Sequence, residues 1–204
     1  MSSEVKANKL SPATGTDVVL GDASDTFTIP ASATLDVNGT IDVTGATVTG
    51  LSAGKVLQVV TTKSQTVVSS TSVINLESTD PYTNDQGVEM LTATITPNAT
   101  ANRLVVVCSF VGTTLNGSPP TIALWQDSDT NAIAAANSCT NGTDSGGHIG
   151  LIWEQAAGTT SATTFKIRGG PTGATTFYMN GWYTGILAWG GVPISTLQIW
   201  EIEA

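Results

Sequence analysis

Residues 103–111 read RLVVVCSFV, and this stretch decides the fold class. Val and Phe favour an extended backbone, because branched and aromatic side chains pack well on a pleated surface. Alternate residues of a strand point to opposite faces. The two faces of this strand would be formed, in turn, by Leu104, Val106, Cys108 and Phe110, and by Val105, Val107 and Val111. The stretch therefore predicts a β-strand that is apolar on both faces.

The end of the chain repeats this pattern. Residues 195–204 read STLQIWEIEA, with Leu197 and Ile199 on one face and Trp200 and Ile202 on the other. A sandwich of two sheets covers only the inner face of each strand, so an apolar outer face needs a second cover. A subunit interface is the simplest cover, which makes Trp200 a candidate interface residue. The alternative cover is a long loop of the same chain.

Short strands separated by turn-forming clusters fill the region from Val56 onward. Only 11% of the 204 residues are charged, and Thr, Ser, Asn and Gly, which favour strands and turns, are abundant. Many short strands without a strong helix signal predict an all-β sandwich or jelly roll. Residues 131–138, NAIAAANS, fit either a short helix or a buried strand. The predicted strands are Val56–Thr66, Gln65–Leu76, Glu89–Thr96, Arg103–Val111, Thr121–Trp125, Ala132–Ala136, Gly147–Glu154, Thr163–Arg168, Thr175–Asn180 and Thr196–Glu203.

A six-residue repeat precedes these strands. In residues 34–51, TLDVNGTIDVTGATVTGL, a branched apolar residue, Asp, Val, a polar residue and Gly recur two and a half times. Stacked repeats need about three copies to share a core, and an isolated segment cannot offset the entropy lost on ordering. Three chains wrapped around one axis would supply the missing core. The inward residues would then be Leu35, Val37, Ile41 and Val43. The alternative is a flexible Thr/Gly linker.

These patterns divide the chain into three parts. Residues 1–18 are polar and are predicted to form an N-terminal anchoring arm. Residues 19–54 hold the short alternating runs and the repeat, and are predicted to form a short fibrous β stalk. Residues 55–204 hold the longer strands and are predicted to form the head.

Charge and composition exclude several classes of function. The net charge is −9, whereas binding to a phosphate backbone needs a basic surface, so we expect no nucleic-acid partner. The apolar runs are too short to span a bilayer, so we expect no membrane insertion. The opening MSSEVKANKL lacks the apolar stretch of a secretory signal, so we expect no export by that route. Cys108 and Cys139 are read as free thiols.

The sequence motifs that could carry chemistry predict no catalytic site and no metal site. His148 has no G-x-S-x-G motif to serve as a nucleophile elbow. Asp127 and Asp129 resemble the start of a calcium loop, but Ala132 and Ser138 stand where that loop needs Gly and Glu, so a turn is expected. Four carboxylates flank one loop and are read as solvated rather than as a glycosidase pair: Glu77, Asp80, Asp85 and Glu89. We therefore predict no enzyme activity and no cofactor.

Aromatic residues gather in the Gly-rich segment NGWYTGILAWGGVP, residues 180–193. Trp182, Tyr183 and Trp189 carry polar edges and bury large areas at low entropic cost, which suits contact with a sugar or a protein surface. They are the candidate residues for such a contact. The alternative is that they fill the trimer axis or pack under the loop.

The sequence resembles the tail-fibre-like proteins of bacteriophages, particularly marine ones. Residues 3–30, SEVKANKLSPATGTDVVLGDASDTFTIP, are similar to the opening of such fibres. Four further stretches are similar to the head that often accompanies it: GKVLQVV (54–60), ITPNATANRLVVV (95–107), TTSATTFKIR (159–168) and ISTLQIWEIEA (194–204). None of these stretches is a catalytic signature.

The resemblance implies a homotrimer in which a short intertwined β stalk carries a jelly-roll head, similar in shape to tumour-necrosis-factor-like trimers. It implies a structural virion protein, assembled in the host cytoplasm and exposed on the particle surface. Its head would bind a host cell-surface glycan or protein, and its arm would hold another virion protein, on the tail or the capsid. Two alternatives stay open: a capsid decoration or head-fibre trimer without receptor binding, and a glycan-degrading tailspike.

Overall fold

The computed structural model describes residues 54–75, 81–138, 144–182, 186 and 188–204, together with positions 26, 28–29, 34 and 36–40. The chain divides into two compact units, Met1–Val48 and Thr49–Ala204. The described positions of the first unit belong to no helix or strand.

The second unit is all-β, as predicted. Its described residues form ten strands, and their helical structure is limited to a short 3-10 turn, η2 (Ala188–Gly191). Each predicted strand overlaps one observed strand. The strands are β1 (Val56–Ser64), β2 (Val68–Ser70), β3 (Val88–Ile95), β4 (Arg103–Leu115), β5 (Pro120–Gln126), β6 (Ala134–Asn137), β7 (Asp144–Ala156), β8 (Thr163–Pro171), β9 (Phe177–Met179) and β10 (Ser195–Ile202).

One detail of the prediction is wrong, and one alternative that it left open is decided in favour of the predicted strand. The strand predicted over Gln65–Leu76 is only three residues long, because the Ser70 hydroxyl accepts a hydrogen bond from the backbone N–H of Ser72 (3.1 Å) and closes a turn there. The helix considered for residues 131–138 is absent. Its Ala-rich part forms β6, which pairs with β5 along the edge of a sheet.

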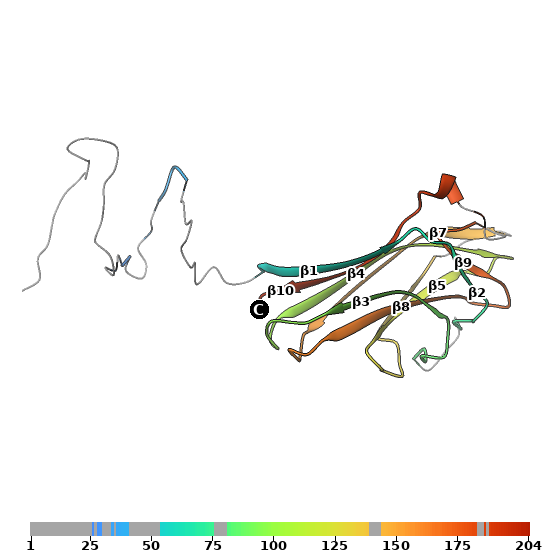
Figure 1. The fold of residues 1–204 in the computed structure, drawn as a ribbon, viewed down its shortest axis with the longest axis horizontal. Helices are drawn as coiled ribbons and strands as arrows, with labels where there is room; N and C mark the ends of the chain where they lie inside the picture. Colours follow the sequence, from blue (N-terminus) through green and yellow to red (C-terminus); the bar gives the residue numbers. More distant parts are fainter. Residues whose placement is uncertain are drawn as a thin grey trace, which may run out of the picture. The chain divides into compact units, whose positions relative to one another are not determined.

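The strands form two antiparallel sheets that face each other (Figure 1). The first sheet has the order β1-β10-β4-β9-β2, with β7 also paired with β4. The second sheet has the order β3-β8-β5-β6. Five pairs are nested along the chain: the short strands β2 with β9, and four pairs of longer strands, β1 with β10, β3 with β8, β4 with β7, and β5 with β6.

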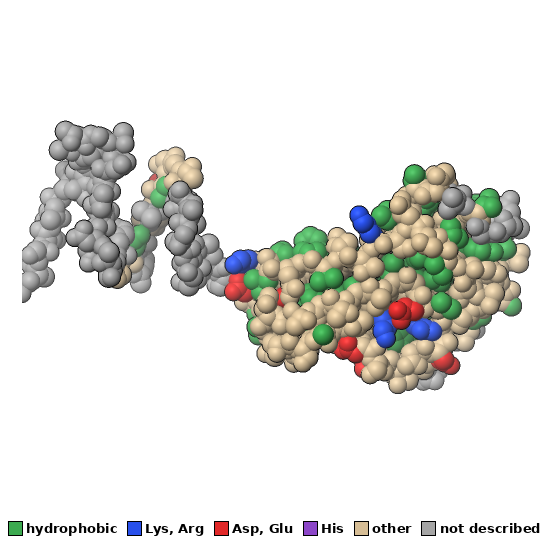
Figure 2. All heavy atoms as spheres, in the orientation of Figure 1, with side chains coloured by type: hydrophobic (Ala, Val, Ile, Leu, Met, Phe, Trp, Pro, Cys, Tyr) green, Lys and Arg blue, Asp and Glu red, His purple; other side chains and the backbone are tan. Residues whose placement is uncertain are grey.

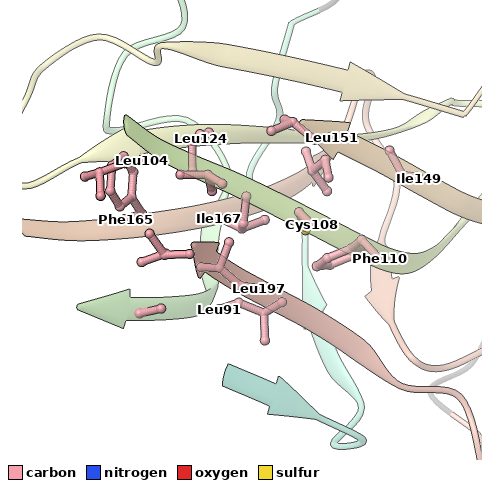
Figure 3. Packing of buried hydrophobic residues seen from close by; sticks show 14 of the residues in the cluster. Leu91, Leu104, Cys108, Phe110, Leu124, Ile149, Leu151, Phe165, Ile167 and Leu197 are labelled. Atoms are coloured by element: carbon pink, nitrogen blue, oxygen red, sulfur yellow. The ribbon is translucent and has the colours of Figure 1, made fainter. Parts of the chain in front are cut away.

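The core fills the space between the sheets (Figure 3). The predicted inner face of β4 is confirmed, since Leu104, Val106, Cys108 and Phe110 are at most 2% exposed. They pack with apolar side chains from both sheets, which include Leu91, Ile122, Leu124, Ile149, Phe165, Ile167, Leu197 and Ile199. Burial of this many large apolar side chains is the main contribution to the stability of the head.

The chain itself covers much of the outer face of the second sheet. Ile74 is fully buried, and a Cβ built on Gly170 would lie 2.3 Å from the carbonyl oxygen of Ser72, so this part of the loop between β2 and β3 rests directly on β8. Arg168 donates hydrogen bonds to the carbonyls of Gln86 (2.8 Å) and Gly87 (2.7 Å). The loop is therefore fastened at both ends over this sheet.

Candidate functional site

The outer face of the first sheet differs from that of the second because its apolar side chains are exposed. Directly paired residues of neighbouring strands share a face. Val59 of β1 pairs with Trp200 of β10, which pairs with Val105 of β4, and in the next row Val107 of β4 pairs with Ile152 of β7. We call these five residues the open face. Val59 is 45% exposed and Ile152 is 73% exposed, whereas Val105, Val107 and Trp200 are half-buried.

Polar pairs border the open face. Arg103 and Glu154 form a bidentate ion pair, with Nε–Oε1 at 2.7 Å and Nη2–Oε2 at 2.9 Å. The hydrogen bonds that Arg103 donates to Glu154, together with the negative charge of Glu154, raise the pKa of Arg103. The Ser109 hydroxyl lies 2.8 Å from Nε2 of His148. An apolar centre bordered by paired polar groups is the usual composition of a protein–protein interface.

The loop between β9 and β10 starts from a buried polar anchor. Asn180 is fully buried, and its Nδ2 donates hydrogen bonds to the carbonyls of Ser64 (2.8 Å) and Thr66 (3.2 Å). Its Oδ1 accepts a hydrogen bond from the Ser195 hydroxyl (2.8 Å), and the next carbonyl, of Gly181, accepts one from Thr113 (2.8 Å). Asn180 has φ 56°, a left-handed conformation that Asn tolerates better than most residues. The base of the loop is thus fixed on both sides.

The rest of this loop presents apolar side chains. We call the described residues of 180–194 the aromatic loop. The rings of Trp182 and Trp189 lie edge to face, with centroids 6.0 Å apart and an interplanar angle of 71°. Trp189 is 62% exposed, and three apolar neighbours are also exposed: Ile186, Val192 and Ile194. Hydrophobic side chains are visible at the surface around this loop and along β1 (Figure 2).

The predicted receptor-binding residues are therefore brought together in part. Trp182 is half-buried, and its backbone N–H donates to the carbonyl of Ile186 (2.9 Å), whereas Trp189 points its ring outward from a left-handed backbone (φ 40°). Glycine would adopt this left-handed conformation without strain, whereas Trp189 adopts it at a cost. What tryptophan provides at this position, and glycine would not, is an exposed indole ring. Tyr183 lies outside the described residues.

The aromatic loop and the start of β1 lie at opposite ends of the head. Ser195, which follows the loop, pairs with Ser64 at the end of β1, whereas Val56 at its beginning pairs with Ile202 near the chain end. A strand of this length spans roughly 25–30 Å. Within the second unit, the chain enters at one end and presents its aromatic loop at the other.

Of the four stalk residues predicted to face inward, Val37 is described. Its side chain is 40% exposed in the single chain. Leu35, Ile41 and Val43 lie outside the described residues, so their predicted burial against other copies remains a prediction.

The residues considered for catalysis or metal binding have structural roles. Asp127 closes the turn after β5, since its Oδ1 accepts from the N–H of Thr164 and its own N–H donates to the Thr164 carbonyl, both at 2.7 Å. The turn predicted there is confirmed. Asp85 accepts a hydrogen bond from the Thr83 hydroxyl, which lowers the pKa of Asp85. Glu77 and Asp80 lie outside the described residues.

Within the described part of the chain, no three His, Cys, Asp or Glu side chains gather where they could hold a metal ion. His148 is hydrogen-bonded to Ser109 there, without a carboxylate on its ring. Cys108 is a free thiol, as predicted, and burial raises its pKa to about 12. Cys139 lies outside the described residues.

No family model matches the chain, and no curated protein matches it. Among the described residues, no helix is long and apolar enough to cross a membrane. Function is therefore inferred from the fold and from the two exposed apolar surfaces, the open face and the aromatic loop.

Proposed function

We propose that this chain is a homotrimeric bacteriophage fibre protein whose head binds the host surface through the aromatic loop. One observation carries the proposal: the aromatic loop lies at the end of the head opposite to Val56, where the chain enters β1. A fibre held by its N-terminal arm would direct that end away from the particle. Exposed Trp189 is the residue expected to make the main contact.

We further infer that the head is a jelly roll. The four nested pairs of longer strands support this topology, because a long antiparallel hairpin folded over on itself pairs its first strand with its last and its inner strands in the same order. The eight strands of these pairs are divided equally, with β1, β10, β4 and β7 in one sheet and β3, β8, β5 and β6 in the other.

The open face supports association into trimers. Val59 and Ile152 are apolar and largely exposed in the single chain, and Trp200 and the valines of β4 lie between them. Burial of such a surface against neighbouring heads would remove it from water. The repeat in residues 34–51 would then wrap with the same two neighbours. Three heads on one fibre would present three aromatic loops, and weak contacts that engage together give strong overall binding.

Binding of the labelled 204-residue protein to a panel of bacterial strains tests this function. We expect binding to some strains, and a loss of about tenfold or more for Trp189→Ala, because three weakened contacts compound. Val88→Ala is the matched control, since Val88 is an exposed apolar residue on the other sheet. Equal binding of wild type and Trp189→Ala would refute the role of the loop. Labelling of particles with antibodies against the head distinguishes a tail fibre from a capsid decoration, and release of new reducing ends from host polysaccharide would indicate a tailspike enzyme.

A further inference from the structure

The aromatic loop belongs to a long uncharged stretch of the chain. Residues 169–200 contain no Asp, Glu, Lys, Arg or His, although the protein as a whole has a net charge of −9. At the strand ends beside the loop, Lys63 of β1 and Asp144 of β7 carry opposite charges. A partner of the loop would therefore meet it without strong electrostatic attraction or repulsion.

The turns beside the loop are uncharged as well. The turns that follow β1, β4 and β8 lie at the same end of the head as the aromatic loop. They read QTV (65–67), NGSP (116–119) and TGATT (172–176). The hydroxyls of Ser118 and Thr172 lie 3.0 Å apart and join two of these turns. Neutral polar groups therefore accompany the loop at this end.

The exposed side chains of the loop itself are apolar. Val192 is 68% exposed, and Trp189 and Ile186 are more than half exposed. The polar side chain of Asn180 is fully buried and makes its three hydrogen bonds inside the head. A sugar presents hydroxyl groups, which aliphatic side chains cannot bond, whereas the acyl chains of a lipid remove such side chains from water. The described part of the loop therefore favours a lipid surface over a glycan.

The lack of charge also weighs against a protein partner. Protein interfaces gain their specificity from complementary charged and polar groups around an apolar centre. Residues 169–200 offer no charged group for this purpose. A bilayer surface needs no such pattern. Tryptophan suits it, because the ring is apolar and the indole N–H can remain among the headgroups.

The backbone of the loop holds the Trp189 ring at the surface. Trp189, Gly190 and Gly191 have φ values of 40°, 70° and 81°, which are all left-handed. Strained positions of this kind cluster at binding sites. The Trp189 ring also contacts the ring of Trp182, which is half-buried at the fixed base of the loop. The exposed ring is thus supported by the head.

We propose that the aromatic loop binds the surface of a lipid bilayer, with Trp189, Ile186 and Val192 entering the boundary between headgroups and acyl chains. The contact is interfacial and involves no membrane-spanning segment. The inference rests on the proposed function, which directs this end of the head toward the host, and it names lipid as the partner there. Because this end is uncharged, binding should depend on apolar burial and not on attraction to anionic lipids.

Flotation of the 204-residue protein with phosphatidylcholine vesicles tests the contact. The protein should float with the vesicles, and neither added phosphatidylglycerol nor a change of salt concentration should alter the binding much. Trp189→Gly and Val192→Ser should each weaken it by about tenfold. Both variants should fold, since glycine accepts the left-handed φ and Val192 is exposed. Val88→Ser is the matched control, with an exposed valine on the other sheet, and should bind as the wild type does.

Three results would overturn the proposal. The first is absence of flotation with phosphatidylcholine, or flotation only when phosphatidylglycerol is present. The second is equal flotation of the wild type and both loop variants. The third is a lower mass of Trp189→Gly in sedimentation equilibrium, which would place the loop in a subunit interface.

Failure of the proposed function is distinguishable from failure of this inference. Cell binding that needs Trp189, without any binding to vesicles, would leave the proposed function standing and overturn the lipid contact in favour of a protein or glycan. Vesicle binding that needs Trp189, without such dependence in cell binding, would support the lipid contact and refute the role of the loop on cells.

Discussion

The side-chain amide of Asn102 donates a hydrogen bond of 2.6 Å to the carboxylate of Glu201, and both residues are buried. The same carboxylate accepts hydrogen bonds from the backbone N–H of Asn98 (2.7 Å) and from Nε2 of Gln58 (2.6 Å). It thereby joins β1, the loop between β3 and β4, and β10 at the end of the head where the chain enters. Residues 95–107 and 194–204, which are far apart in the sequence, are connected by this contact.

The first prediction concerns pH. Burial raises the pKa of Glu201, but hydrogen bonds from Asn102, Gln58 and the backbone outweigh burial and lower it below its ordinary value of 4.5. A carboxylate with a lowered pKa stabilises the fold above its unfolded pKa, and this contribution disappears as pH falls through the folded value. Urea unfolding should therefore show a loss of stability between neutral pH and pH values below 4.5.

Glu201→Gln separates this carboxylate from all the others. At neutral pH the variant should be less stable by about 2–3 kcal/mol, because the side-chain NH₂ of glutamine would face groups that themselves donate hydrogen bonds. Its stability should also depend less on pH in the acidic range. Glu203→Gln is the control and should keep the wild-type pH dependence. An unchanged free energy of unfolding in Glu201→Gln would contradict this account.

The second prediction concerns the anchor of the aromatic loop. Asn180→Ala loses three side-chain hydrogen bonds. Alanine also tolerates the left-handed φ of this position less well than asparagine does. The variant should therefore be less stable than the wild type by about 2–4 kcal/mol. Asn180→Gly loses the same bonds but accepts the backbone conformation, and should be more stable than Asn180→Ala by about 1 kcal/mol. Equal free energies of unfolding for Asn180→Ala and Asn180→Gly, measured with urea, would show that the left-handed backbone at residue 180 is not strained.

The third prediction concerns Cys108. A thiol with a pKa of about 12 carries almost no thiolate near neutral pH, and thiolate is the reactive form. In a Cys139→Ser variant, the single remaining thiol should not react with a disulfide reagent until urea unfolds the protein. Rapid modification of the folded variant would mean that the core between the sheets opens readily.

The strands could be predicted from the sequence because their burial alternates. Leu104, Val106, Cys108 and Phe110 occupy the inner positions of β4 in both the prediction and the structure. The same alternation contained a signal that sequence analysis missed. Glu201 lies on the same face of β10 as Leu197 and Ile199, so its carboxylate occupies an inner position. A buried carboxylate needs hydrogen-bond donors. The donors come from residues far away along the chain, so no local pattern identifies them.

Loop placement could not be predicted, for the same physical reason. The segment that covers the second sheet is held by Arg168 through two backbone carbonyls, a contact that spans about half of the head in sequence. The pocket between Tyr82 and Thr121 arises from the position of this loop on the sheet, and neither residue is distinctive by itself. The contact between Trp182 and Trp189 likewise depends on the three-dimensional course of their loop.

The fourth prediction concerns the open face. Ile152→Asp places a charge at its most exposed residue and should separate the copies without unfolding them, since a side chain that is 73% exposed contributes little to the core. Val88→Asp is the matched control, with an apolar side chain that is 38% exposed on the other sheet. The control should keep the wild-type mass. Light scattering coupled to size exclusion measures both, and an unchanged mass for Ile152→Asp would exclude the open face from the interface.

The central claim is that three copies form one fibre, and the mass of the 204-residue chain in solution tests it most directly. Sedimentation equilibrium should give three times 20.9 kDa, which is 62.7 kDa, at micromolar concentration. A mass of 20.9 kDa, the single chain, would contradict the account, because the exposed apolar residues of the open face and the repeat of residues 34–51 would then have no partner.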